Sequence, residues 1–257
     1  MKQETNESEN VLSSVRNALR ILRSFSMDEP EKGVRELAKS LGLGKSSVSR
    51  LMATLACEGF LKKNPETQQY RLGASVLSLA TIATSNLELY TEAVPFIKKL
   101  VDRIGETAHL GILEGTDVVY LHKVECTHAV RIFTHIGKRS PAHSSGCGKA
   151  ILAFQNEEVI NKVIEKGLQS ITQQTITNPD DLRNHLDVIR KQGYAIGMEE
   201  LFDGIVSIAA PIRDYTRQVI AALNVVGPAQ RIKRKDIPYY SKEVIQVANY
   251  ISENLGY

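Results

Sequence analysis

The segment from Val34 to Leu55 constrains the fold most strongly, because it joins two short helical patterns through a glycine turn. The first pattern ends at Leu41, and Gly42 suits the left-handed backbone position that closes a helix. The second pattern begins after Gly44. Its apolar positions recur at the spacing of one helix face: Val48, Leu51, Met52 and Leu55. Two short helices joined in this way predict a helix-turn-helix arrangement.

The polar face of the second helix carries hydrogen-bond donors and cations but no carboxylate. It consists of Lys45, Ser46, Ser47, Ser49 and Arg50. Hydroxyl and guanidinium groups on the first turns of a helix suit the major groove of DNA, where they meet phosphates and base edges. We therefore predict that these five residues contact DNA. The alternative is an ordinary solvated helix surface.

A basic hairpin pattern follows the second helix. Residues 60–63 and 68–72 have strand composition, and the turn between them contains Pro65. A hairpin in this place is the wing of a winged-helix domain. We expect its cations to touch phosphates or an adjacent minor groove: Lys62, Lys63 and Arg71. An apolar helical stripe from Leu12 that ends by Met27 precedes the motif. This order favours DNA binding over the protein-contact role of some winged helices.

The patterns divide the chain into four segments. We predict a disordered tail over residues 1–11, a winged-helix domain over 12–73, a linker helix over 74–90 and a second domain over 91–257. The stretch from Ala74 to Leu89 leaves little polar surface for a helix that only connects two domains. We therefore expect it to serve as both connector and dimer contact.

The second domain mixes helix and strand patterns, which predicts an α+β fold with an antiparallel sheet covered by helices. We expect helices over Glu92 to Gly105, Asp180 to Gln192 and Ile237 to Leu255. The expected strands are Ala108 to Leu113, Val118 to Val124, Ala129 to His135, Ile205 to Ile212 and Val219 to Val226.

A turn of small residues, Ser144 to Gly148, precedes a helix that we expect to open at Lys149. Backbone N–H groups at a helix start form an anion site by geometry, and close packing of a tight turn is the alternative. The pattern of a P-loop is not met, because Ala150 stands where that motif needs a hydroxyl. The position of Cys147 beside a helix start allows a lowered pKa, although a buried structural thiol is the more common outcome.

Composition excludes several classes of function. The formal net charge of +3 is nearly balanced, so a nucleic-acid site must be a local patch. The longest apolar runs are too short to span a membrane, the N-terminus lacks the apolar core of a signal peptide, and the three cysteines are scattered. These features predict a cytoplasmic protein with reduced thiols. His109 and His122 lie in strand patterns without metal-ligand spacing. We expect no catalytic residues, metal or cofactor.

From about Ser14 onward, the chain resembles the IclR family of bacterial transcription regulators. The resemblance rests on residues 15–22, 43–51, 145–153, 208–212 and 224–228. Residues 119–123 and the ending Leu255-Gly256-Tyr257 resemble the branch that regulates 2-keto-3-deoxygluconate and pectin-sugar genes. The resemblance implies a winged helix-turn-helix joined to a GAF-like effector domain. It also implies a homodimer or dimer of dimers and an organic-acid effector: a keto acid, a sugar acid or an aromatic acid.

The resemblance also implies which residues hold the effector. The backbone of the turn at Ser145, Gly146 and Cys147 would grip the acid. The other aligned positions are Gly197, Ser207, Asn224 and Val226. Family members that bind glyoxylate or pyruvate typically have Asp, Cys, Ser and Ser at these four positions. The differences favour a ligand of another shape, and a vestigial pocket is the alternative.

Together, these patterns predict a ligand-responsive regulator that binds a double-stranded DNA operator, with repression favoured over activation. Three other possibilities remain open at this point. They are a redox sensor acting through Cys147, an enzyme in residues 91–257 and a winged helix used for protein contacts.

Overall fold

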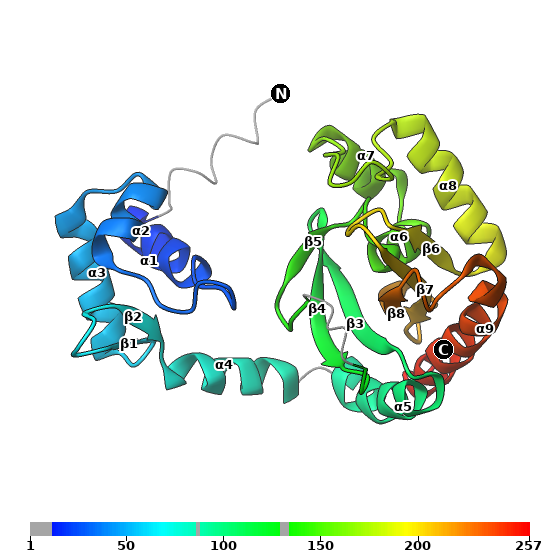
Figure 1. The fold of residues 1–257 in the computed structure, drawn as a ribbon, viewed down its shortest axis with the longest axis horizontal. Coiled ribbons are helices and arrows are strands. Elements are labelled where there is room, and N and C mark those ends of the chain that lie inside the picture. The colour runs from blue at the N-terminus through cyan, green and yellow to red at the C-terminus, as the bar shows by residue number, and fades with distance from the viewer. Residues whose placement is uncertain (1–11, 86–87, 129–133) are drawn as a thin grey trace. The chain divides into compact units, whose positions relative to one another are not determined.

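The computed structural model describes residues 12–85, 88–128 and 134–257. The chain forms two compact units that divide between residues 86 and 87. The predicted disordered tail over residues 1–11 lies outside the described residues. Figure 1 shows the elements of each unit.

The first unit contains a helix-turn-helix followed by a two-stranded hairpin. Its elements are α1 (Ser13–Arg23), α2 (Val34–Leu41), α3 (Lys45–Cys57), β1 (Leu61–Lys63), β2 (Tyr70–Leu72) and α4 (Ala74–Ser85). Gly42 takes a φ of 66° after α2, and the Leu43 N–H then donates to the Ala38 carbonyl at 3.0 Å. The predicted helix, turn and helix are therefore confirmed.

One small core holds this unit together. Its buried side chains come from α1, α2, α3 and both strands: Ile21, Leu37, Val48, Met52, Leu61 and Tyr70. The predicted apolar stripe to Met27 overran the first helix, which ends at Arg23. Met27 is exposed, and the Ser24 hydroxyl turns back to donate to the Ile21 carbonyl at 2.6 Å. The strands of the wing are also shorter than predicted, because Gln68 takes a φ of 59° in the turn.

The second unit is built on a six-stranded antiparallel sheet in the order β5-β4-β3-β8-β7-β6. The strands are β3 (Thr107–Glu114), β4 (Asp117–Val124), β5 (Arg139–Pro141), β6 (Ala195–Met198), β7 (Ile205–Arg213) and β8 (Val219–Pro228). The helices are α5 (Glu88–Ile104), α6 (Gly146–Leu152), α7 (Glu157–Glu165), α8 (Pro179–Gln192), the 3-10 turn η1 (Arg234–Asp236) and α9 (Ile237–Asn254). The predicted α+β class and antiparallel sheet are confirmed.

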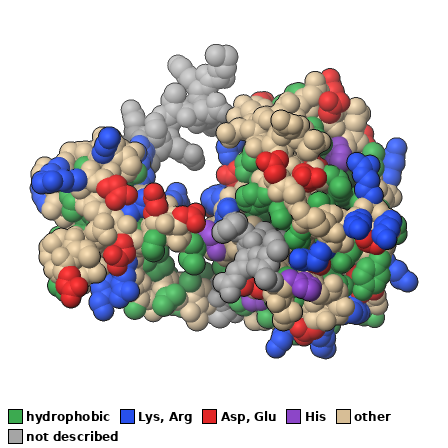
Figure 2. All heavy atoms as spheres, viewed as in Figure 1, with side chains coloured by type: hydrophobic (Ala, Val, Ile, Leu, Met, Phe, Trp, Pro, Cys, Tyr) green, Lys and Arg blue, Asp and Glu red, His purple; other side chains and the backbone are tan. Residues whose placement is uncertain are grey.

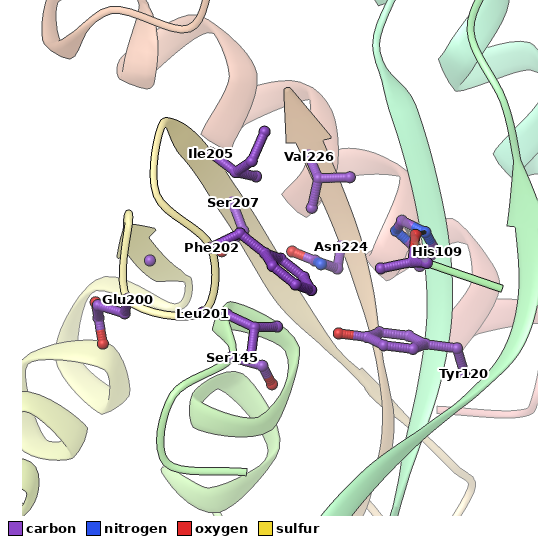
Figure 3. Close-up of a pocket in the computed structure, with 13 residues that line it drawn as sticks. His109, Tyr120, Ser145, Glu200, Leu201, Phe202, Ile205, Ser207, Asn224 and Val226 are labelled. Atoms are coloured by element: carbon purple, nitrogen blue, oxygen red, sulfur yellow. Dashed lines mark hydrogen bonds between the residues drawn. The ribbon is translucent and has the colours of Figure 1, made fainter. Parts of the chain in front are cut away.

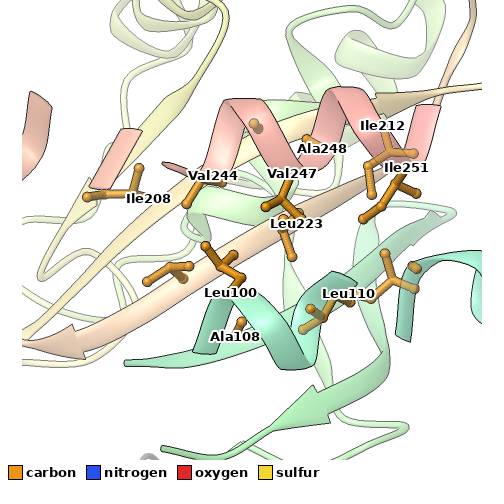
Figure 4. Close-up of a cluster of buried hydrophobic side chains, with 14 of the residues drawn as sticks. Leu100, Ala108, Leu110, Ile208, Ile212, Leu223, Val244, Val247, Ala248 and Ile251 are labelled. Carbon is orange, nitrogen blue, oxygen red and sulfur yellow. The ribbon is translucent and has the colours of Figure 1, made fainter. Parts of the chain in front are cut away.

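Alternation along the strands gives the sheet two different faces. One face packs on α5 and α9 through branched side chains such as Ile208 of β7 and Leu223 of β8. Figure 4 shows this cluster between the helices and the strands. The other face carries smaller residues such as Ala209 and Ala222, and it packs on α6, α7 and α8. The smaller side chains let α6 lie close to the sheet.

Several predicted bounds in the second unit were wrong. The helix expected from Glu92 begins at Glu88 and continues through Pro95. An interior proline costs about 3 kcal/mol in a helix, but burial of Leu89 and Ala93 before it and of Ile97 after it holds the segment helical. In the first unit, the helix expected to reach Leu89 is described as far as Ser85, and Leu89 belongs to α5. Most of the strand expected over 129–135 lies outside the described residues, and Thr134 and His135 are not in a strand.

Among the described residues, no helix is both long and apolar enough to cross a membrane.

Candidate functional site

The first turns of α3 present their polar side chains to solvent. Val48 and Met52 are fully buried and fix the helix in the core. The opposite face exposes all five predicted DNA contacts: Lys45, Ser46, Ser47, Ser49 and Arg50. Among the described residues, neither cation of this face lies within 4.0 Å of a carboxylate. The face is therefore available to a polyanion. On other parts of the surface visible in Figure 2, cations and anions are interspersed.

The wing divides its three cations between two faces. Lys62 of β1 pairs with Arg71 of β2, so the two side chains lie side by side on the solvent face. Lys63 pairs with buried Tyr70 instead, and its Nζ lies 5.6 Å from the centre of the Tyr70 ring. The structure thus brings Lys62 and Arg71 together and places Lys63 on the other face of the hairpin.

A pocket opens in the second unit on the side of the sheet that carries α6. The unfilled space between its lining atoms is about 380 Å³ when the open solvent at its mouth is included. Its lining residues come from five strands, the segment before β5, the start of α6 and the loop after β6: His109, Tyr120, Thr134, Ser145, Gly146, Gly197, Glu200, Leu201, Phe202, Ile205, Ser207, Asn224 and Val226. Figure 3 shows the Asn224 amide, the Tyr120 hydroxyl and the Phe202 ring pointing toward the same space.

Strand register brings the predicted effector residues together. Gly197 pairs with Ser207, Ser207 pairs with Val226, and Asn224 pairs with His109. All of them lie on the α6 side, because the alternate positions carry the apolar residues that face α9. Six of the seven residues predicted to hold the effector line the pocket. The exception is Cys147.

The glycines let backbone approach Ser207 closely. A Cβ atom at Gly146 or at Gly197 would lie 2.5 Å from the Ser207 Oγ atom, which is closer than real Cβ atoms come. The Ser207 hydroxyl therefore lies between two bare backbone segments, one from α6 and one from β6.

Helix α6 begins at Gly146, three residues before the predicted start at Lys149. Ser145 is the N-cap, and its hydroxyl accepts a hydrogen bond from the Gly148 N–H at 2.8 Å. A favourable cap therefore extends the helix into the glycines. Within the described residues, the backbone N–H groups of Gly146 and Cys147 have no protein acceptor. These two groups are the donors that the small-residue turn predicted.

Cys147 is a buried structural thiol. Its Sγ lies 3.7 Å from the Ala222 carbonyl oxygen, and a Cβ at Gly111 would lie 2.6 Å from it. Burial raises the pKa of the Cys147 thiol to about 12. Of the two alternatives, the buried thiol is therefore the one found. The position at a helix start does not lower the pKa of Cys147, because loss of hydration outweighs the effect of the helix dipole. This thiol lacks the thiolate character of a redox sensor.

Two buried polar groups of the pocket have no partner among the described residues: the Asn224 Oδ1 and the His109 Nδ1. The other ring nitrogen of His109 shares a hydrogen bond of 2.6 Å with the Thr134 hydroxyl. Burial, together with the charges of Lys123 and His122, lowers the pKa of His109 to about 3. The imidazole is therefore neutral near pH 7.

A buried ion pair supports the wall of the pocket. The Lys149 ammonium contacts both carboxylate oxygens of Glu200 at 2.5 and 2.6 Å and donates to the Ile196 carbonyl at 3.0 Å. The Thr172 and Thr175 hydroxyls donate to the backbone carbonyl oxygens of Glu199 and Glu200 at 2.7 Å. These contacts fix the loop from Glu199 to Gly204 against α6 and against the segment between α7 and α8.

Sequence patterns missed six residues of the pocket: Tyr120, Thr134, Glu200, Leu201, Phe202 and Ile205. His109 was noted only as a residue of a strand pattern without metal-ligand spacing, and its register with Asn224 places it in the pocket. The loop after β6 contains no sequence pattern that predicts a ligand-binding role. In the parts of the chain that the structure describes, no cluster of three His, Cys, Asp or Glu residues is arranged to hold a metal ion.

Comparison with known families identifies both units. The pattern of the IclR helix-turn-helix domain matches residues 14–65, and that of the bacterial transcriptional regulator IclR C-terminal domain matches residues 81–253. The chain belongs to the IclR family of bacterial transcription regulators. It is a DNA-binding regulator with a C-terminal effector domain, as the sequence resemblance implied.

Curated relatives are similar over almost their whole length. The chain is 31% identical to the regulator XynR of Escherichia coli over 96% of this chain and 98% of the relative. It is 31% identical to KdgR of Escherichia coli, with 96% and 94% covered, which fits the predicted branch. It is 30% identical to the transcriptional repressor IclR of the same organism, with 95% and 90% covered.

Solved IclR structures share the fold of the whole chain. An IclR regulator from Alicyclobacillus acidocaldarius has a TM-score of 0.86 and 26% identity, covering 96% of this chain and 100% of that one. An IclR homologue from Microbacterium hydrocarbonoxydans, solved in complex with 4-hydroxybenzoate, has a TM-score of 0.84 and 26% identity. It covers 95% of this chain and 99% of that one. These relatives are transcription regulators.

Proposed function

We propose that the chain is a repressor whose α3 enters the major groove of a double-stranded DNA operator. The exposed face of Lys45, Ser46, Ser47, Ser49 and Arg50 supports this role most directly, because it offers donors and cations without a competing carboxylate. Arg50 and the serines at 46 and 47 contact bases or phosphates, whereas Lys45 contacts a phosphate.

The wing adds phosphate contacts beside the groove. Lys62 and Arg71 lie next to each other on the solvent face of the hairpin, which suits a shared stretch of DNA backbone. Lys63 lies on the opposite face and has an aromatic ring beside it. We therefore assign Lys62 and Arg71 the main role in the wing, with Lys63 as a peripheral phosphate contact.

The pocket of the C-terminal domain binds a small organic acid: a keto acid, a sugar acid or an aromatic acid. Ser145, Gly146, Gly197, Ser207, Asn224 and Val226 hold it with their side chains or backbone, and Cys147 contributes only its backbone N–H. The complex of an IclR homologue with 4-hydroxybenzoate supports an acid ligand. The free N–H groups at the start of α6 supply donors for a carboxylate.

The working form is a homodimer or a dimer of dimers. Leu77, Leu79 and Ile82 of α4 are 71%, 55% and 59% exposed in the single chain, a set of apolar residues that favours contact with another chain. Residues 12–73 form the DNA-binding domain, 74–90 the linker and 91–257 the effector domain. Two copies then place two α3 helices in successive major grooves of a near-palindromic operator in the cytoplasm.

Repression is proposed over activation because the curated relatives include a repressor by name, the transcriptional repressor IclR of Escherichia coli. Activation by the same architecture is the alternative. It requires only that the ligand favours the DNA-binding spacing of the two α3 helices instead of opposing it.

A single substitution on α3 tests the proposed DNA contact. An operator is first selected from random duplex DNA by the purified protein, and binding is measured by fluorescence anisotropy at fixed salt. Arg50→Ala is expected to weaken operator binding about 10-fold or more, because it removes a charge-assisted contact worth about 1–3 kcal/mol. It should leave ligand binding unchanged.

The control for that experiment is Arg234→Ala, which removes the same charge from an exposed position in the second unit. It is expected to leave operator affinity within about 2-fold of the parent protein, because no residue of the second unit is among the proposed DNA contacts. Equal affinity of Arg50→Ala and Arg234→Ala would contradict the placement of α3 in the groove.

A further inference from the structure

The deep end of the pocket contains two polar groups that lack partners. Asn224 is 2% exposed and His109 is fully buried, yet the Asn224 Oδ1 and the His109 Nδ1 have no hydrogen-bond partner among the described residues. Their backbones pair across β3 and β8, and both side chains lie on the α6 side of the sheet. A buried polar atom without a partner is unfavourable, so the pair points to an occupant that supplies hydrogen bonds.

Among the described residues, this end of the pocket offers no unpaired cation, since the Lys123 ammonium contacts Glu125 at 2.7 Å and donates to the Thr134 carbonyl at 2.6 Å. The His109 imidazole is neutral because burial and neighbouring cations lower its pKa to about 3. The described lining residues include no Lys or Arg. The Lys149 ammonium contacts both carboxylate oxygens of Glu200 at 2.5 and 2.6 Å, so Glu200 already neutralises its charge. A carboxylate against Asn224 would therefore lose its hydration without gaining a counter-ion.

The two side chains favour a group that both donates and accepts. An amide offers acceptor and donor positions, and a neutral imidazole offers one of each. A hydroxyl group fits both, since it has one proton to donate and lone pairs to accept with. It can donate to the Asn224 Oδ1 and accept from a His109 Nδ1–H, which leaves the His109 Nε2 to accept from the Thr134 hydroxyl.

On the basis of the ligand-binding role proposed above, we propose that the effector presents a neutral hydroxyl to Asn224 and His109. The effector is then a hydroxylated organic acid, such as a sugar acid or a hydroxylated aromatic acid, and not an unsubstituted keto acid. The Phe202 ring and the Val226 side chain line the same space and pack against the carbon skeleton that carries this hydroxyl.

Matched ligand pairs that differ in hydroxylation test this inference. Calorimetric titration of the full chain compares 4-hydroxybenzoate with benzoate, lactate with propionate, and gluconate with hexanoate. For at least one pair, the hydroxylated acid is expected to bind about 10-fold or more tightly than its partner. A site that hydrogen-bonds a hydroxyl strongly rejects an analogue that lacks it, because the groups of the site are then left unpaired.

Two variants locate the source of that preference. Asn224→Leu replaces the amide by an apolar side chain of similar shape, and it is expected to reduce the preference within the pair to about 2-fold or less. Asn224→Ala gives the same readout if the leucine variant does not fold. Val226→Ala removes methyl groups two residues further along the same strand, so it should weaken both members of the pair alike and keep their ratio.

The outcomes separate this inference from the proposed function. Equal binding of the two members of every pair that binds would overturn the hydroxyl contact and leave organic-acid binding intact. An unchanged preference in the Asn224 variants would overturn the assignment of the contact to Asn224. No binding of any acid would overturn both this inference and the proposed acid ligand.

Discussion

At the scale of single residues, the chemistry of the pocket depends on polar groups that the fold removes from water, such as His109 and Asn224. Ser207, Asn224 and Gly197 were identified by family resemblance, and strand register brings them together in the pocket. The environment of His109 depends on Thr134, Lys123 and His122, which approach it only in the folded sheet. No spacing rule along the chain reveals such a neutral histidine.

The neutrality of His109 predicts a pH dependence of stability. Its pKa is lowered from 6.5 to about 3 in the folded chain, so below pH 6.5 the unfolded chain binds a proton that the folded chain excludes. The free energy of unfolding should therefore fall as pH falls from 6.5 toward 3, with about 2–3 kcal/mol lost by pH 4.5.

Urea unfolding at pH 7 and pH 4.5 measures this loss. His109→Gln keeps a polar side chain but has no group that titrates in this range. Its loss of stability between the two pH values should be smaller than that of the parent protein by about 2–3 kcal/mol. Parallel losses in the two proteins would show that His109 is not held neutral by the fold.

At the scale of elements, the bounds of a helix follow from the local sequence where helical spacing, turn residues and packing in the core all favour the same structure. Helix α2, its Gly42 turn and the start of α3 match the prediction, because helical spacing and a left-handed glycine point to the same geometry. The predicted start of α5 at Glu92 was four residues too late, although the helix does continue through Pro95, because burial on the sheet overrides the local penalty. The loop after β6 has no periodicity in its sequence. Its position depends on Lys149, which is far away along the chain but contacts Glu200 in the fold.

That lysine gives a prediction about how α6 and the loop hold together. Lys149→Met removes the only cation that contacts Glu200 among the described residues and leaves a buried carboxylate unpaired. The expected cost is about 3–5 kcal/mol of unfolding free energy. Lys162→Met breaks an exposed ion pair of 2.7 Å with Glu158 and should cost far less, because water already screens that pair.

Chemical denaturation of the two lysine variants beside the parent protein provides the comparison. The difference between Lys149 and Lys162 arises from burial, since both ammonium groups contact a carboxylate at short distance. A Lys149→Met protein as stable as Lys162→Met would mean that Glu200 is readily protonated or rehydrated, and that the ion pair does not anchor the loop.

At the scale of the whole molecule, one chain joins a DNA-binding unit to a ligand-binding unit. Both units were predictable from sequence, because each carries several family motifs in a fixed order. The link between their functions is thermodynamic. If a ligand changes the affinity for DNA, then DNA must change the affinity for the ligand by the same factor.

The most direct test is the operator affinity of the full chain, measured at fixed salt with and without a saturating acid from the calorimetric pairs. We predict a change of about 5-fold or more, with DNA altering the affinity for that acid by the same factor. Ser207→Ala should keep the affinity for DNA without ligand but shift the ligand dose–response. An operator affinity that stays the same while the acid is bound would contradict the account.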